Sequence, residues 1–217
     1  MKVWDLPTRL FHWLIVLLVC FSWWSAETGQ MEWHYRSGLA ALILLVFRVL
    51  WGFVGGSTAR FAYFLKSPMA AVAYLRQPKD APKKAGHNPL GGYSVIAMLL
   101  ALIVQVGTGL FAVDVDGIES GPLSYLVDFD QGRVAANVHH LAFTLVQVLV
   151  VLHLVAIAYY RLRGRRLIVP MITGRDGQLS ASAGEVTGGG ALRAIVVLAL
   201  ALGIGWWISL GAPLGGS

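Results

Sequence analysis

Four histidines stand near the ends of apolar stretches that are long enough to cross a membrane: His12, His34, His139 and His153. His139 and His153 lie on the same stretch, fourteen residues apart. At about 100° and 1.5 Å per residue, fourteen helical residues fall roughly 40° short of four turns and rise about 21 Å. Both imidazoles therefore share a helix face. This separation suits two metal centres, one near each membrane surface, better than one shared site.

The neighbouring His140 makes a poorer partner for His153. It is thirteen residues away, which turns its side chain roughly 140° from that of His153. We therefore expect His139 to face the site and His140 to point elsewhere. Only Thr144 and Gln147 interrupt the apolar residues between His140 and His153, as expected for a helix in hydrocarbon.

The composition places the chain among integral membrane proteins. Of its 217 residues 57% are hydrophobic and 13% charged, and the mean hydropathy is +0.67. The single Cys20 offers neither a disulfide nor a C-x-x-C-H site for covalent haem, so any haem is held without thioethers. We predict an all-α membrane protein with five spans, at Leu10 to Ala26, Tyr35 to Val54, Gly92 to Val113, Val138 to Tyr160 and Leu192 to Leu210.

The net charge of +6 follows membrane topology and does not indicate nucleic acid. The positive-inside rule predicts a cytoplasmic N-terminus and a periplasmic C-terminus. The basic residues gather before the first span, between the second and third, and after the fourth: Lys2, Arg9, Arg60, Lys66, Arg76, Lys79, Lys83, Lys84, Arg161, Arg163, Arg165, Arg166 and Arg175. The opposite loops are acidic, with Glu27, Glu32, Asp114, Asp116, Glu119, Asp128 and Asp130 against Arg36 and Arg133.

The first span also invites interpretation as a cleaved signal peptide. We favour a retained span, because no clean A-x-A site follows it and His12 interrupts the apolar run near its beginning. Arg9 lies one turn before His12 on about the same helix face.

The second span brings further candidate binding residues. His34 stands at its periplasmic end, and Gly38, one turn later on the same face, leaves room for a flat, bulky group. Arg48 lies deep in this span, where it either snorkels to the cytoplasmic interface or pairs with an anion.

The loop that follows the second span is not featureless. Ser67 and Pro68 predict the N-cap and first residue of a short interfacial helix. His87, beside glycine and proline, is either a structural or solvated loop residue or a weak candidate for a quinone site. The third span has no histidine, so it supplies walls rather than ligands, and we expect the last span to be peripheral.

Depth in the membrane determines how the histidines pair. His12 and His153 lie toward the cytoplasmic side, and His34 and His139 toward the periplasmic side. Two imidazoles from facing helices can fill both axial positions of a haem iron, which leaves no open position and favours electron transfer. Candidate counter-cations for the haem propionates are Arg9 or Arg48 inside and Arg36 outside.

Three other interpretations stay open at this point. A single histidine at a span end is usually an interfacial or packing residue, but four matched in depth favour a site. Zinc or copper is the second interpretation, although two lone imidazoles with no thiolate or carboxylate nearby make an incomplete zinc site. A proton-relay transporter would need carboxylates at mid-depth, and the spans contain none.

The chain resembles the bacterial di-haem cytochrome b-561 family, which includes the b-type cytochrome subunit of nickel-iron hydrogenases. The matching pieces are WDLPTRLFHW around His12, WHYRSG around His34, and the VHHLAF to VLHLVA stretch with His139 and His153. The resemblance implies a four-helix bundle in the bacterial inner membrane with two b-type haems on these four histidines. It also implies electron transfer between the quinone pool and a periplasmic redox protein, with a hydrogenase small subunit as the family-based candidate. The acidic outer face suggests a basic c-type cytochrome instead.

We therefore expect a di-haem domain at residues 1–175, a Gly/Ser/Ala-rich linker at 176–191 and an added helix at 192–217. The acidic outer loop is either simply solvated or a landing surface for a basic partner. The leading hypothesis is an electron-transfer subunit. The alternatives are a self-sufficient superoxide:quinone oxidoreductase and, less favoured, a transporter or scaffold without haem.

Overall fold

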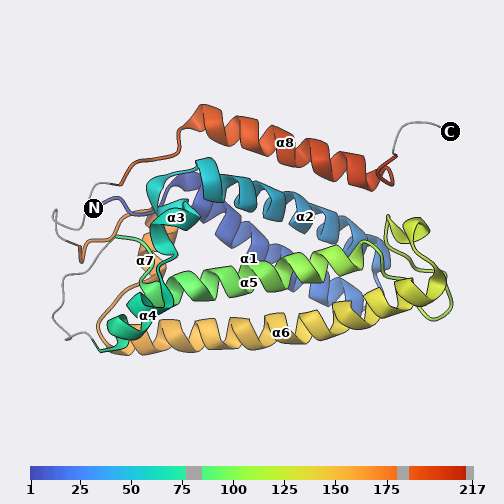
Figure 1. The fold of residues 1–217 in the computed structure, drawn as a ribbon, viewed down its shortest axis with the longest axis horizontal. Coiled ribbons are helices and arrows are strands. Elements are labelled where there is room, and N and C mark those ends of the chain that lie inside the picture. Colours follow the sequence, from blue (N-terminus) through green and yellow to red (C-terminus); the bar gives the residue numbers. More distant parts are fainter. Residues whose placement is uncertain (77–84, 180–185, 214–217) are drawn as a thin grey trace. The chain divides into compact units, whose positions relative to one another are not determined.

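A computed structural model describes residues 1–76, 85–179 and 186–213, and within these ranges the chain forms only helices, loops and isolated β-bridges. Five helices are long and apolar enough to span a membrane: α1 (Leu6–Glu27), α2 (Met31–Val54), α5 (Pro89–Gly109), α6 (Phe129–Leu162) and α8 (Ala191–Ser209). The predicted all-α membrane fold with five spans is confirmed (Figure 1). The expected basic residues Lys79, Lys83 and Lys84, and the middle of the expected linker, lie outside the described residues.

Short helices complete the described chain: η1 (Ser57–Ala59), α3 (Phe61–Phe64), α4 (Pro68–Leu75), η2 (Ser124–Leu126) and α7 (Ile168–Thr173). The predicted start of α4 is confirmed, because Pro68 is its first residue and the Ser67 hydroxyl accepts a hydrogen bond from the Ala70 amide at 3.3 Å. Figure 1 shows α3 and α7 near the N-terminus of the chain, and α4 beside the C-terminal end of α6.

The chain divides into two compact units, and each long helix contributes residues to both. Unit 1 consists of residues 1–12, 48–98 and 149–197, and unit 2 of residues 13–47, 99–148 and 198–217. Each unit is described separately below.

The N-terminal segment is built into the core of unit 1. The Val3 amide donates to the carbonyl of Gly174 at 2.8 Å, and the Thr58 hydroxyl donates to the carbonyl of Val3 at 2.7 Å. Gly174 ends α7 in the left-handed conformation, with φ +79°, which glycine adopts without strain. Asp5 then caps α1, because its carboxylate accepts a hydrogen bond from the Thr8 amide at 2.9 Å.

A segment just before α8 covers the buried Trp51 in unit 1. Trp51 has no exposed surface, and its indole N–H donates to the Asp5 carboxylate at 3.2 Å. The Ser57 amide donates to the carbonyl of Thr187 at 2.9 Å, which fixes the segment. A methyl group on Gly189 would lie 2.3 Å from the Trp51 ring, so this close approach requires glycine.

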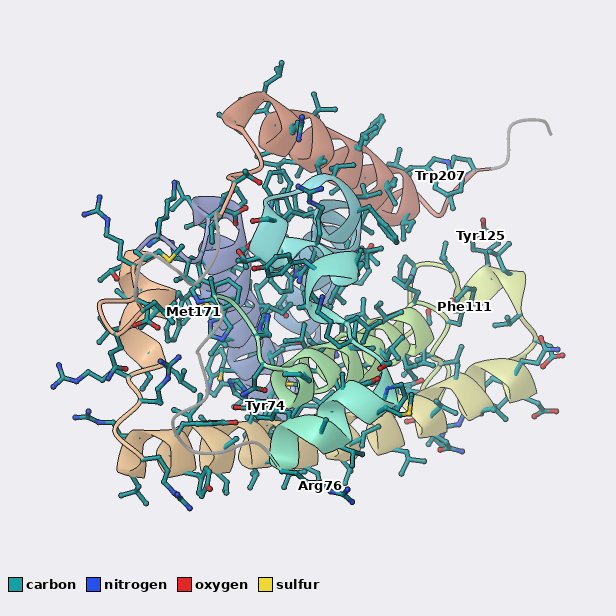
Figure 2. All side chains as sticks on the ribbon, turned by 60° about the vertical axis from the view of Figure 1, so that its left-hand side comes forward. Tyr74, Arg76, Phe111, Tyr125, Met171 and Trp207 are labelled. Carbon is teal, nitrogen blue, oxygen red and sulfur yellow. The ribbon has the colours of Figure 1, made fainter. Side chains whose placement is uncertain are left out.

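In unit 2, α8 packs closely against α2. Ala201 of α8 is fully buried, and a methyl group on Gly205 would lie 2.3 Å from the Ile43 side chain. The Tyr125 hydroxyl, which points toward the end of α8 in Figure 2, donates to the carbonyl of Gly211. The described part of α8 is therefore anchored at several points, although most of its surface is exposed, as expected for a helix in lipid.

Helix α6 begins well before the apolar run that predicted it. Its first residue is Phe129, whereas hydropathy placed the start of the span at Val138. A capping box explains the difference: the Gln131 amide donates to the Asp128 carboxylate at 2.8 Å, and the Asp128 amide donates to the Gln131 side chain at 3.2 Å. These reciprocal bonds satisfy amide groups at the start of the helix, so α6 extends through polar residues.

Candidate functional site

The four histidines form two pairs, and each pair lies within one unit. In unit 1, the ring centroids of His12 on α1 and His153 on α6 are 6.5 Å apart. In unit 2, the ring centroids of His34 on α2 and His139 on α6 are 6.0 Å apart. These are the partners that depth and helical spacing predict. Their role as ligands stays a prediction.

Both separations fit two imidazoles that share one metal ion. A metal–imidazole bond is about 2 Å long, so opposed rings on one metal place their centroids roughly 6 to 6.5 Å apart. Among the described residues, no three His, Cys, Asp or Glu side chains gather around a possible metal position. A pair alone suits a haem, because the porphyrin supplies the remaining ligands and the protein need supply only the axial two.

Backbone carbonyls orient both rings of the unit 2 pair. The Nδ1 atom of His139 lies 2.7 Å from the carbonyl oxygen of Gln105, and Nδ1 of His34 lies 2.9 Å from that of Ser22. A carbonyl oxygen can only accept a hydrogen bond, so each Nδ1 carries the N–H and each Nε2 keeps its lone pair. This is the tautomer and second-shell contact of a metal-binding histidine.

Gln105 contacts the His139 ring, and the sequence did not predict this contact. Besides its carbonyl contact, its side-chain Nε2 lies 2.9 Å from Nε2 of His139 and donates to the lone pair there, so this hydrogen bond would have to break for His139 to bind iron. The third span, α5, therefore positions the His139 ring through the Gln105 carbonyl, in addition to supplying packing surface. A glutamine within an apolar run was the available sequence signal for the side-chain contact. The carbonyl contact has no sequence signal, because every residue has a backbone carbonyl.

Two glycines near the unit 2 pair differ in what surrounds them. A methyl group on Gly38 would meet no atom within 4 Å, which fits the predicted open space for a flat group. A methyl group on Gly109 would lie 2.9 Å from Cε1 of His139, so this glycine allows α5 to approach the ring.

The three arginines proposed as counter-cations occupy different surroundings. Arg48 is 3% exposed, so it does not snorkel to the surface, and its Nη1 atom has no hydrogen-bond partner among the described residues. Arg9 is partly buried and donates to the carbonyl of Ile172, while its Nε has no partner among those residues. Arg36 is exposed and pairs with Glu32 at 2.5 Å. Arg48 is therefore the strongest candidate for holding a buried anion.

The two remaining histidines differ from each other. His140 is exposed on α6, with its ring 6.3 Å from that of His139. His87 lies in unit 1 between two aromatic rings, 4.7 Å from Trp4 and 5.1 Å from Phe64 by centroids. His87 is therefore a half-buried residue held against aromatic rings and not a freely solvated loop residue.

Comparison with known proteins identifies the family. The model of the prokaryotic cytochrome b561 family matches residues 3–174, and the chain therefore belongs to this family. The chain is 25% identical to a probable Ni/Fe-hydrogenase B-type cytochrome subunit of Rhizobium leguminosarum bv. viciae, over 79% of this chain and 87% of that protein. A subunit of the same name from Azotobacter chroococcum is 24% identical, over 79% and 86% of the two chains.

A more distant match covers less of the chain. The probable Ni/Fe-hydrogenase 1 B-type cytochrome subunit of Escherichia coli K12 is 24% identical over 58% of this chain and 67% of that protein. No solved structure matches the chain at a significant level. The family and the five apolar helices together make this chain a multi-pass membrane protein of electron transfer that uses haem b.

Proposed function

We propose that this protein carries electrons between the membrane quinone pool and a periplasmic redox partner through two haem b groups. His12 and His153 would hold one haem, and His34 and His139 the other. The observation that carries this proposal is that each unit contains one imidazole pair at the separation expected for a single iron.

The residues around the pairs favour electron transfer over reactions at the metal. When bound, haem b supplies reversible one-electron exchange. Each pair of imidazoles would hold the haem iron from both sides and so would leave no coordination site for oxygen or substrate. The carbonyls of Ser22 and Gln105 hold the rings of His34 and His139 in one orientation and increase their basicity as ligands.

The partner is inferred from the relatives and from charge. The relatives bear the name of Ni/Fe-hydrogenase cytochrome subunits, so a hydrogenase small subunit is the first candidate. The carboxylates of Asp116, Glu119 and Asp128 in unit 2 are exposed. A basic c-type cytochrome would fit this surface electrostatically and is the second candidate.

The proposal includes an orientation and a division of the chain. The charge distribution supports a cytoplasmic N-terminus and a periplasmic C-terminus in the bacterial inner membrane. The family match over residues 3–174 supports residues 1–175 as the haem domain, followed by a linker at 176–191 and an added helix at 192–217.

Single substitutions on α6 test the two haem sites. Protein purified in detergent should contain two haems per chain in a pyridine haemochrome assay. His153→Ala and His139→Ala should each retain one haem and lose one redox transition, because a lone axial imidazole holds haem weakly. His140→Ala is the matched control, since it removes an exposed imidazole from the same helix and should retain both.

The result that would overturn this proposal is full haem content and both transitions in His153→Ala or His139→Ala. The quinone step is measured separately, as haem reduction by a quinol analogue in the purified protein. If a quinol analogue does not reduce the haem within the time of turnover, quinone is removed from the proposal. The proposed haem sites are unaffected by that result.

A further inference from the structure

We propose that His87 and Arg48 together form a carboxylate-binding site beside the His12–His153 pair, and that it holds a haem propionate. This inference rests on the proposed function, because it requires a haem at that pair. The inference adds His87 to the site as a hydrogen-bond donor to the propionate.

The first observation is a buried cation with donor capacity to spare. Arg48 lies against the faces of Phe11 and Phe61, with its guanidinium carbon 5.9 and 5.3 Å from their ring centroids. The ion pairs among the described residues join Arg36 to Glu32 and Arg165 to Asp176, so they do not include Arg48. A buried positive charge is costly in free energy unless an anion pairs with it.

Asp5 balances this charge only in part. Its negative charge acts on Arg48, but its two oxygens already accept hydrogen bonds from the Thr8 amide and the Trp51 indole. The Nη1 atom of Arg48 remains without a partner among the residues described. The guanidinium can therefore bind a further acceptor.

The second observation is a shielded imidazole nitrogen on the same aromatic wall. The Phe61 ring, which Arg48 faces, is 5.9 Å from Phe64, and Phe64 is 5.1 Å from His87. Nδ1 of His87 is shielded from solvent and has no hydrogen-bond partner in the described chain. An unsatisfied polar atom of this kind is costly unless a ligand completes it.

His87 is neutral near physiological pH and can still donate a proton. Burial, reinforced by the positive charge of Arg48 and by His153 and His12, lowers the pKa of His87 to about 3. A neutral imidazole offers one N–H donor. The guanidinium and this N–H therefore provide one charged and one neutral donor, which suits a carboxylate.

The loop holds His87 in place from both sides. Gly86 before it has φ +88°, a conformation that favours glycine. Asn88 after it accepts from the Gly91 amide at 2.7 Å and donates to the hydroxyls of Tyr160 at 2.8 Å and Tyr74 at 3.1 Å. These bonds connect the loop to α5, α6 and α4, so the donor is positioned before the ligand arrives.

The test compares haem with haem dimethyl ester, in which both propionates are neutral. The apoprotein of a His139→Ala variant, which keeps only the His12–His153 pair, is reconstituted with either cofactor. The dissociation rate is measured by transfer to apomyoglobin, and the midpoint potential by titration. We expect the ester to dissociate about tenfold faster or more, because it loses a charge-assisted hydrogen bond.

Substitutions then locate this difference. In His87→Phe and Arg48→Gln, haem should dissociate faster and the difference between haem and its ester should shrink toward onefold. His87→Gln retains an N–H donor and should restore part of the difference. Arg193→Gln removes an exposed cation of α8 and is the matched control. The same series in a His153→Ala background, which keeps only the other pair, should show no effect of His87 and reports correct folding.

Two results would overturn the inference. The first is that haem and its ester dissociate at the same rate when His87 and Arg48 are both unsubstituted. The second is that the difference between their rates is undiminished in both His87→Phe and Arg48→Gln. Either is distinguishable from failure of the proposed function, in which the His139→Ala protein binds no haem through His12 and His153 at all.

Discussion

Individual histidine rings are positioned by atoms that a sequence does not reveal. The fourteen-residue spacing predicted which histidine of α6 faces the site, because helical geometry fixes the angle between them. The carbonyl contacts of Ser22 and Gln105 with the two rings were not predictable, since the contact depends on backbone position and not on residue type. The sequence thus predicts the ligand types and their pairing, and the carbonyl contacts add the position of the proton on the His34 and His139 rings.

The close approach of α5 to His139 gives a prediction at this scale. Gly109→Val should displace the His139 ring, because even a methyl group would lie 2.9 Å from Cε1. We expect loss of the haem held by His34 and His139 and retention of the other, measured by haemochrome content and redox titration.

Gly203→Val is the control for this substitution. Gly203 is also a helical glycine of unit 2, and a methyl group there would meet nothing within 4 Å. Equal haem loss in both variants would mean that general destabilisation, rather than contact with His139, is responsible.

At the scale of elements, hydropathy located the spans, but several helix boundaries differ from the predicted ones, most of all the start of α6. The start of α4 was predicted correctly, because Ser67 and Pro68 have strong local preferences. The start of α6 was wrong by several residues, since the prediction followed apolar residues and overlooked the capping signal of Asp128 and Gln131. The short helix α3 had no comparable signal in the sequence.

The capping box predicts the effect of a single carboxylate. Asp128→Ala should lower the free energy of unfolding of the first turns of α6 by about 1 kcal/mol. Faster hydrogen exchange at the amides of residues 129–132 measures this change.

Asp130→Ala provides the comparison within the same turn. Asp130 carries the same charge near the helix N-terminus but makes no capping bond to Gln131. If Asp130→Ala increased exchange as much as Asp128→Ala, charge near the helix end and not the capping box would determine its stability.

At the scale of the molecule, charge separates the two units more clearly than hydropathy does. Unit 2 contains the exposed carboxylates of Glu27, Asp116, Glu119 and Asp128, whereas the basic loops of the chain belong to unit 1. This division agrees with the charge pattern that composition predicted. The partition into two units was not predictable, because it cuts across every long helix.

The acidic surface of unit 2 predicts a salt-dependent reaction with a basic partner. Electron exchange with mitochondrial cytochrome c should slow as ionic strength rises toward about 0.15 M, where the Debye length is about 8 Å. Asp116→Asn combined with Glu119→Gln should reduce both the rate and its salt dependence, as measured by stopped-flow absorbance.

Reduction by a neutral quinol analogue serves as the control and should not depend on salt. If exchange with cytochrome c were equally independent of salt, the acidic loop would be a solvated surface only. A hydrogenase small subunit would then be the remaining partner candidate.

The seating of Thr187 and Gly189 over Trp51 bears on how the protein is made in the cell. Unit 1 includes the first twelve residues and residues as far as 197, so it cannot close before the segment with Thr187 and Gly189 has been synthesised. We predict that haem binding at the proposed His12–His153 site follows insertion of α6, and that a polypeptide truncated ahead of Thr187 leaves the buried Trp51 side chain uncovered.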